Sequence, residues 1–246
     1  MINFDNFIPN KKQYRNKNKL APQWPFRCLI VGASGSSKTN TAFNMILNQE
    51  FMVDFDSLYV YAKVDQEKMQ FLQKYMHSIE DEIQKETGET ISLIKYSNSL
   101  DDLIPVDQLD PSKQNLILLD DFNNELNDKQ YQKILKDYFT MSRHHNTSVI
   151  LIAHSYYSIP KVIRLNSSHV LIYKLNSRRE LNQIYHDTPN NVSKDTFKEM
   201  YARVISRDRY AFLMLDPANP DKKYQYRIGF DETMEDLLKK DELREM

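Results

Sequence analysis

Glycine, cysteine and long apolar runs are scarce in this chain of 246 residues. Two of its four glycines fall between positions 32 and 35, which marks a place where the backbone needs unusual freedom. The single cysteine, Cys28, cannot form an intrachain disulfide, and this favours a reducing, intracellular setting. No stretch approaches the ~20 apolar residues of a membrane-spanning helix. The N-terminus also lacks the basic-then-apolar order of a signal peptide, so we expect a protein that is neither secreted nor membrane-spanning.

The chain also lacks a strong net charge. Its formal charge is −1, so no overall field draws it to nucleic acid or to a membrane. The charge is uneven, however, because residues 11–19 contain five basic residues and no acidic one, whereas the last sixteen residues are rich in acid. We expect a basic N-terminal arm at 1–24, one domain at 25–230 and an acidic C-terminal helix or tail at 231–246. The basic cluster could contact phosphate, although a simply solvated cluster is the plainer interpretation. Its members are Lys11, Lys12, Arg15, Lys17 and Lys19.

The segment 26–48 has the pattern of an apolar strand, a loop of small residues and a helix. Its loop, GASGSSKT, matches the phosphate-binding motif G-x-x-x-x-G-K-[ST] at every fixed position but one, where Ser37 replaces glycine. Small side chains let backbone N–H groups wrap around phosphates, and the helix that follows points its positive end at the anion. Lys38 is expected to reach the β- and γ-phosphates, and the Thr39 hydroxyl to ligate Mg²⁺. The predicted nucleotide-binding residues are Gly32, Ala33, Ser34, Gly35, Ser36, Ser37, Lys38 and Thr39.

A second apolar run, within residues 115–122, is followed directly by two adjacent aspartates. Four apolar residues followed by acids are typical of a buried parallel strand, whose carboxyl end faces the ligand crevice of an α/β sheet. Asp120 is expected to hold Mg²⁺, directly or through water. Asp121 stands where a base could orient the attacking water. Taken alone, the pair would indicate an acidic turn, but the phosphate-binding loop upstream favours a site.

The rest of the chain alternates between strand and helix patterns, which predicts one doubly wound α/β domain with a mainly parallel sheet flanked by helices. A helix is also expected directly after Pro160, another beginning at Arg178 and Arg179, and a last one containing Met234, Leu237 and Leu238. Strands are predicted at 57–61, 91–96, 147–154 and 168–174, helices at about 65–85 and 128–143, and a β-hairpin at 210–215 with 224–230.

Two classes of phosphate-loop protein lack support in this sequence. We find neither the N-K-x-D motif by which a GTPase recognises guanine nor the Ser-Gly-Gly-Gln signature of an ABC-type ATPase. The spacing between the loop and the acidic strand leaves room for the strand at Ile91. This arrangement favours the RecA-like (ASCE) ATPases, which use an acidic residue near the metal aspartate to activate water.

Four segments together resemble the poxvirus-type genome-packaging ATPases of the FtsK–HerA superfamily. They are IVGASGSSKT, LILLDDF, YFTMSRHHNTSVILIAHSYYSIPKVIRLNSSHVLIYKL and RRELNQIY, within residues 24–185. The resemblance implies an ATP-driven motor that moves double-stranded DNA into a viral capsid. It also implies ATP and Mg²⁺ as ligands, a homo-oligomeric ring, a capsid or portal-like partner, and action inside the host cell or the virion.

The chain departs from that family at two positions. Ser37 replaces the loop glycine, and Ala153-His154-Ser155 stands where the family usually has Thr-Gln-Ser at the end of its sensor strand. Histidine can still hydrogen-bond a γ-phosphate or water, so His154 is a candidate sensor, although a histidine at a strand end can also be purely structural.

Three arginines are candidates for the arginine finger that supplies charge to the transferring phosphoryl group. These are Arg143, Arg178 and Arg179. The alternative for each is a solvated arginine at a helix end, which helix-dipole logic favours for Arg143.

The sequence leaves two other functions open. One is a nucleotide-binding scaffold with little hydrolysis, to which Ser37 and His154 lend support. The other is a nucleotide kinase, which would need a second small-molecule pocket and lid arginines that the sequence does not reveal.

Overall fold

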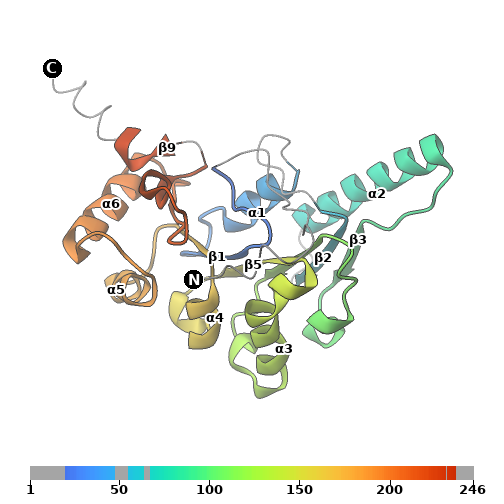
Figure 1. Cartoon of the computed structure of the whole chain (residues 1–246), viewed down its shortest axis with the longest axis horizontal. Helices are drawn as coiled ribbons and strands as arrows, with labels where there is room; N and C mark the ends of the chain where they lie inside the picture. Colours follow the sequence, from blue (N-terminus) through green and yellow to red (C-terminus); the bar gives the residue numbers. More distant parts are fainter. Residues whose placement is uncertain (1–19, 48–54, 64–66, 231, 237–246) are drawn as a thin grey trace, which may run out of the picture.

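The computed structural model describes residues 20–47, 55–63, 67–230 and 232–236 as one mainly parallel sheet with helices on both faces (Figure 1). The predicted α/β fold class is thus confirmed. The basic cluster at residues 11–19 and most of the acidic tail lie outside the described residues. No helix among the described residues is long and apolar enough to cross a bilayer.

The described residues form a nine-stranded sheet in the order β3-β2-β4-β5-β1-β6-β7-β8-β9. Strands β1 to β6 pair in parallel, and β7, β8 and β9 extend one edge in antiparallel fashion. The strands are β1 (Arg27–Val31), β2 (Ser57–Ala62), β3 (Ile94–Ser97), β4 (Asn115–Asp120), β5 (Thr147–Ala153), β6 (His169–Ile172), β7 (Leu213–Leu215), β8 (Tyr226–Ile228) and β9 (Glu232–Thr233).

Helices cover the two faces of the sheet unequally. Side chains of α1 and α2 pack into the core on one face, and those of α3 to α6 pack into the core on the other. Figure 1 shows α1 and α2 above the sheet and α3 and α4 below it. The helices are α1 (Lys38–Leu47), α2 (Glu67–Thr87), α3 (Lys129–Thr140), α4 (Lys161–Asn166), α5 (Arg178–Asp187) and α6 (Lys194–Arg207).

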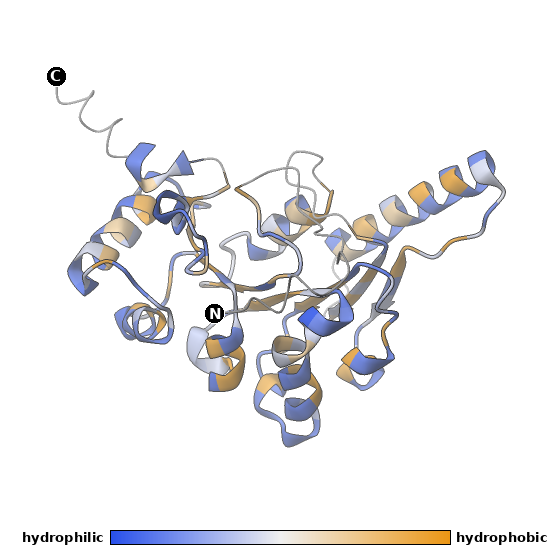
Figure 2. Cartoon of the chain, viewed as in Figure 1, coloured by the Kyte–Doolittle hydropathy of each residue, from blue (hydrophilic) through white to orange (hydrophobic). Residues whose placement is uncertain are grey.

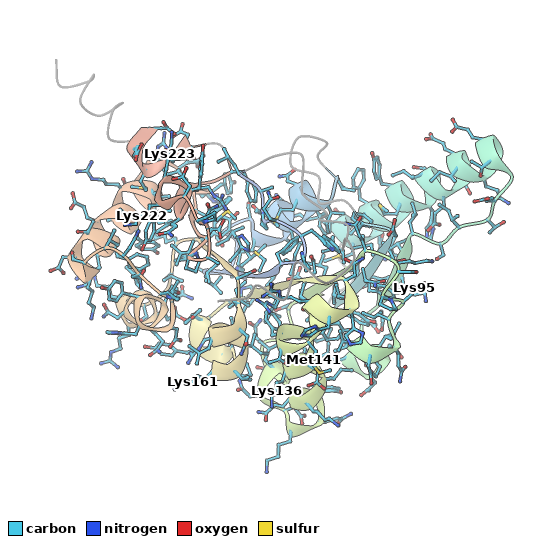
Figure 3. All side chains as sticks on the ribbon, viewed as in Figure 1. Lys95, Lys136, Met141, Lys161, Lys222 and Lys223 are labelled. Atoms are coloured by element: carbon cyan, nitrogen blue, oxygen red, sulfur yellow. The ribbon has the colours of Figure 1, made fainter. Side chains whose placement is uncertain are left out.

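The central strands form because their side chains are apolar on both faces. Every residue of β2, β4 and β5 is buried, as a parallel sheet covered on both sides requires. Figure 2 shows the hydrophobic residues concentrated on these strands, whereas the helices carry hydrophilic residues as well. Lysines such as Lys136 and Lys161 project outward from the covering helices (Figure 3). The core thus holds the carboxyl ends of the strands as a rigid platform.

Most predicted elements occur where the sequence patterns placed them, with several differences. β3 begins at Ile94 and β7 at Leu213, each three residues after its predicted start, at Ile91 and Tyr210. The third helix ends at Thr140, and Arg143 lies in a separate 3₁₀ turn. α6 and β9 were not predicted. The β-hairpin of β7 and β8 is confirmed by their antiparallel register.

A buried ionic cluster joins the antiparallel strands to the parallel ones. The fully buried Arg227 of β8 donates to Asp216 at the end of β7, 3.2 Å away. His169 of β6 contacts the same carboxylate at 3.4 Å. Burial alone would raise the pKa of Asp216, but the hydrogen bond from His169 and the positive charges around it hold that pKa below its usual value. The cluster therefore joins polar side chains from three neighbouring strands of the sheet and their ends.

Candidate functional site

The phosphate loop, residues 32–39, lies between β1 and α1 at the carboxyl edge of the parallel strands. β5 lies between β1 and β4 in the sheet, so His154 follows the strand that separates the loop from the aspartates. This order brings the ends of three strands together at one edge, where ligands of open α/β sheets bind. Because side chains from all three meet there, the edge is the candidate site.

Backbone conformation explains the two key positions of the loop. A Cβ added to Gly32 would lie 2.5 Å from the Tyr173 Cβ, closer than real Cβ atoms approach, so only glycine fits. Ser37, which replaces the expected glycine, has φ +67°. A serine in the left-handed conformation is strained, because its Cβ lies too close to the following carbonyl oxygen. This conformation costs roughly 1–2 kcal/mol of free energy. The motif prefers glycine at this position because glycine adopts the left-handed conformation without strain. In this chain Ser37 adopts the same conformation.

The other loop residues differ in their exposure to solvent. Ser36 is buried and donates to the Ala33 carbonyl at 2.8 Å. Ser34 and Gly35 are exposed, and Gly35 also has a left-handed φ of +72°. The loop thus presents small, exposed residues at its tip, as a phosphate cradle requires.

Lys38 is buried, and its ammonium group contacts three acceptors. It donates to the carbonyl oxygens of Gly32 and Ala33, both 2.8 Å away, and lies 3.2 Å from the Nδ1 atom of His154. Burial lowers the pKa of Lys38 to about 8, against the opposing attraction of Asp120 and Asp121. The site therefore holds a positive charge that burial destabilises and that an anionic ligand would stabilise.

Thr39 and Asp120 present two oxygen ligands side by side. The Thr39 hydroxyl donates to Oδ2 of Asp120 over 2.9 Å. Burial raises the pKa of Asp120, and the charge of Asp121 adds to the effect, while the hydrogen bond from Thr39 opposes it. A buried carboxylate beside a hydroxyl suits Mg²⁺, which binds one or two protein oxygens and completes its shell with phosphate and water. The Thr39 hydroxyl and the Asp120 carboxylate therefore suit a magnesium ion.

Asp121 lies in the turn after β4 with φ +63°, a left-handed conformation that aspartate tolerates better than most residues. Its Oδ1 is 3.2 Å from the Nε2 atom of His154. Because lysine can only donate, the Lys38 contact makes Nδ1 of His154 an acceptor, which leaves the ring proton on Nε2 to face Asp121. His154 therefore bridges the loop lysine and the candidate base.

Asn123 is a site residue that the sequence did not single out. Its Nδ2 donates to Oδ1 of Asp121 at 3.0 Å, and its Oδ1 accepts from the backbone N–H of His154 at 2.9 Å. One side chain thus joins the turn after β4 to the end of β5. No sequence signal distinguishes it, because an asparagine three residues past a strand is ordinary loop composition.

The three candidate finger arginines lie at opposite ends of the sheet. Arg178 and Arg179 begin α5, which follows β6 at the carboxyl edge, and both are exposed. Arg143 is exposed in the turn that precedes β5, and its charge contributes to lowering the pKa of Arg27 after the larger effect of burial. Arg27 starts β1, so Arg143 lies at the amino edge. Within one chain the fold brings the Arg178–Arg179 pair, but not Arg143, to the edge of the site.

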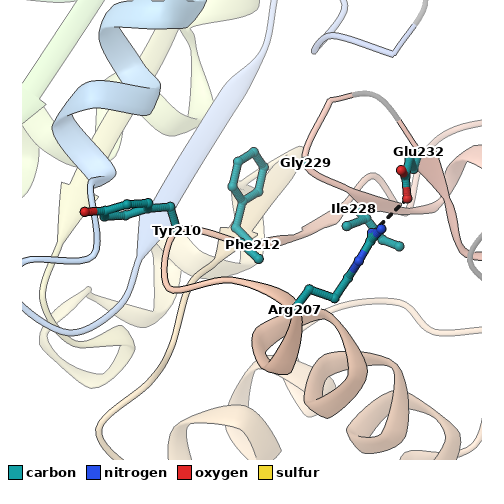
Figure 4. A pocket seen from close by; sticks show the side chains of 7 residues that line it. Arg207, Tyr210, Phe212, Ile228, Gly229 and Glu232 are labelled. Carbon is teal, nitrogen blue, oxygen red and sulfur yellow. Dashed lines mark hydrogen bonds and ion pairs between the residues drawn. The ribbon is translucent and has the colours of Figure 1, made fainter.

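A pocket of about 190 Å³ lies near the same edge (Figure 4). Phe212 lines it and packs at 5.0 Å between ring centroids against Tyr173, the residue that touches Gly32. An ion pair of 2.8 Å between Arg207 and Glu232 borders the pocket. The phosphate loop and this hollow are therefore separated by the Tyr173 and Phe212 rings.

Solved structures of viral packaging proteins share this fold. The genome packaging NTPase B204 of Sulfolobus turreted icosahedral virus 2, in complex with sulfate, matches with a TM-score of 0.58 at 11% identity, over 84% of this chain and 96% of that one. Its complex with AMP gives 0.54 at 14% identity, over 83% and 96%. B204, described as the DNA-packaging ATPase of Sulfolobus turreted icosahedral virus, gives 0.51 at 14% identity, over 83% and 97%. At sequence identities this low, the similarity establishes the fold and nothing beyond it.

Sequence comparison gives the family. No curated protein matches this chain significantly. A family model described as "Poxvirus A32 protein" matches residues 11–242, nearly the whole chain. This match agrees with the resemblance inferred from the four motif segments. The chain therefore belongs to the poxvirus A32 protein family.

Proposed function

We propose that this protein is an ATP-hydrolysing motor that moves double-stranded DNA into a viral capsid. The proposal rests mainly on one observation. Lys38 and Thr39 of the loop lie at one edge of the sheet together with Asp120, Asp121 and His154. Membership of the poxvirus A32 family supports it. The packaging function of the B204 proteins is a further, weaker support, because it rests on a shared fold.

The chain's own residues supply the parts of phosphoryl transfer. Lys38 would exchange its contacts with the loop carbonyls and His154 for the phosphate oxygens, and its charge would offset the negative charge of the transition state. Thr39 and Asp120 would hold Mg²⁺, which would supply positive charge to offset the negative charge of the phosphates. Asp121 would orient the attacking water and accept its proton. His154 would contact the γ-phosphate or that water from the end of β5.

The remaining parts of the motor lie between subunits. We propose a homo-oligomeric ring that works inside the host cell or the virion, with a capsid or portal-like component as partner. The exposed Arg178 and Arg179 would reach a neighbour's ATP as fingers. Arg143, at the opposite edge, could act only toward a different subunit surface.

Replacement of Lys38 tests the proposal. Lys38→Ala should abolish ATP turnover and leave the circular dichroism spectrum unchanged, because it removes the phosphate-binding charge from a preformed loop. Lys136→Ala is the matched control, since Lys136 is exposed on α3 and should tolerate the change. Normal turnover in a folded Lys38→Ala variant would contradict the proposed site.

Membership of the poxvirus A32 family argues against the alternative function, a nucleotide-binding scaffold with little hydrolysis. A scaffold would bind ATP with little turnover, so the same assay on the unmodified protein separates the two functions.

A further inference from the structure

Glu180 is a buried carboxylate outside the residues that the proposed mechanism uses. It lies in the first turn of α5 with only 3% of its surface exposed. One of its oxygens, Oε2, is buried without a hydrogen-bond partner. Burying a carboxylate without full compensation costs free energy, and apolar residues of similar volume would usually fill such a place at lower cost. A role other than filling space would account for the residue.

The other oxygen of Glu180 binds the segment that follows the sensor strand. Oε1 accepts from the Ser155 hydroxyl and from the backbone N–H of Tyr156, the latter at 2.9 Å. The same hydroxyl accepts from the Tyr157 N–H, so its orientation is fixed from both sides. Glu180 thus joins α5 to the residue that directly follows His154.

Two further contacts attach α5 to the same segment, one near each end of the helix. The Tyr157 hydroxyl donates to the carbonyl oxygen of Arg179 at 3.0 Å. At the far end, Arg164 forms a largely buried ion pair with Asp187 over 3.1 Å. With a contact at each end, the helix is held as a rigid body against residues 155–164.

The segment is joined in turn to the nucleotide side of the site. His154 lies 3.2 Å from both Lys38 and Asp121, and its backbone N–H is held by Asn123. Any ligand that draws Lys38 away from His154 changes the contacts of the residue next to Ser155. Contacts of the adjacent residues His154 and Ser155, joined through the backbone, therefore connect the loop to the helix that begins with Arg178 and Arg179.

We propose that Glu180 is a positioning residue that makes α5 move with the end of β5, so that nucleotide at the phosphate loop changes the placement of the Arg178–Arg179 pair. Glu180 itself touches no reacting atom. This inference rests on the proposed function, because it assumes that nucleotide binds at the loop and that the arginine pair serves a neighbouring site. Coupling of this kind predicts that α5 differs between the nucleotide-free and nucleotide-bound protein.

Amide hydrogen exchange of the full chain, with and without ATPγS, measures both ends of the connection without requiring hydrolysis or DNA. In the unmodified protein, nucleotide should slow exchange in residues 32–39 and change the exchange rates of α5 by about tenfold, a typical size for coupling between sites. In Glu180→Ala, loop protection should persist while the nucleotide-dependent change in α5 falls below about twofold.

Three variants keep the test decisive. Ser155→Ala removes one donor of the contact with little risk to folding, and it should reduce the nucleotide-dependent change in α5 in the same direction. Glu180→Gln keeps an acceptor oxygen for Ser155 and Tyr156, so it should retain most of the change. Glu199→Ala is the matched control, because Glu199 is an exposed glutamate on α6 and should behave like the unmodified protein.

The outcomes separate this inference from the proposed function. Loss of the α5 response with intact loop protection, in Glu180→Ala or in Ser155→Ala, supports the coupling role. A purely structural Glu180 would speed exchange of α5 equally in both ligand states and leave their ratio unchanged, which would overturn the inference. No protection of residues 32–39 in the unmodified protein would instead contradict the nucleotide site of the proposed function, and the inference with it.

Discussion

Two residues of the site hold left-handed backbone conformations without being glycine. Ser37 has φ +67° and Asp121 has φ +63°. Strained residues persist only where the surrounding structure imposes them, and they gather at functional sites. Ser37 is fixed by its place between the loop and the first turn of α1, where its carbonyl accepts from Thr41 at 3.0 Å. The strain at Ser37 and Asp121 therefore marks the two sides of one site.

Ser37→Gly should preserve or raise ATP affinity. Glycine relieves the left-handed strain and lets the backbone approach the phosphates closely, while its extra freedom in the unfolded chain offsets part of the gain. The free energy of unfolding should therefore change by no more than about 1 kcal/mol. Equilibrium nucleotide binding and denaturant unfolding measure both quantities. A large loss of affinity would mean that the Ser37 hydroxyl itself contacts nucleotide or metal.

Asp121→Asn should slow hydrolysis far more than it weakens ATP binding. Asparagine also tolerates φ > 0 and keeps an acceptor for Asn123, so the turn should keep its shape. Loss of the base should lower kcat by roughly 10²–10⁴-fold.

Separate measurements of kcat and of nucleotide Kd decide the role of Asp121. The account expects a Kd close to that of the unmodified protein. A collapse of affinity with a normal rate per bound ATP would show that Asp121 is instead a metal ligand or a structural group.

At the scale of elements, the sequence predicted best those features that depend on neighbouring residues in the chain. The apolar run before the loop and the one before Asp120 predicted β1 and β4, because a buried parallel strand is apolar on both faces. β3 was placed three residues early, since Ile91 is apolar but only half buried.

The contacts that complete the site were harder to predict because they join distant segments. Asn123 and Glu180 each meet residues more than twenty positions away, and polar contacts of that kind leave no periodic pattern. The sequence therefore predicted the strands that carry the site, together with Lys38, Thr39, the aspartates and His154, but it did not single out Asn123 or Glu180. The site roles assigned to these residues stay predictions.

The next prediction concerns α5, whose first two residues, Arg178 and Arg179, are exposed. If this pair completes a neighbour's site, each defective subunit also disables the next one. Mixing the unmodified protein with an Arg178→Ala, Arg179→Ala double variant at fixed total protein should therefore lower activity more than in proportion to the mixing ratio.

A parallel mixing series with Arg143→Ala separates the candidates. Arg143 lies at the amino edge of the sheet, so its substitution should leave the mixing curve close to linear. Strict proportionality for the Arg178–Arg179 variant, at every protein concentration, would show that each subunit hydrolyses ATP alone.

At the scale of the whole molecule, the proposed motor needs a candidate nucleotide site and also surfaces that contact partners. The sheet edge holds the candidate chemistry, and α5 presents cations beside it. The formal net charge of −1 gives no general attraction to DNA, so a DNA contact would have to come from local clusters such as the one at residues 11–19. Such a contact should weaken with salt, because each neutralised phosphate releases counterions.

The most direct test of a DNA-translocating ATPase is the rate of ATP hydrolysis across a titration of linear duplex DNA, at low and moderate salt, with Lys38→Ala as the inactive control. The account predicts a rate that rises with DNA to a plateau, at a midpoint that shifts to higher DNA concentration as salt increases. A rate that stays constant at every DNA concentration would contradict the motor, and bound ATP with no turnover at all would identify a nucleotide-binding scaffold instead.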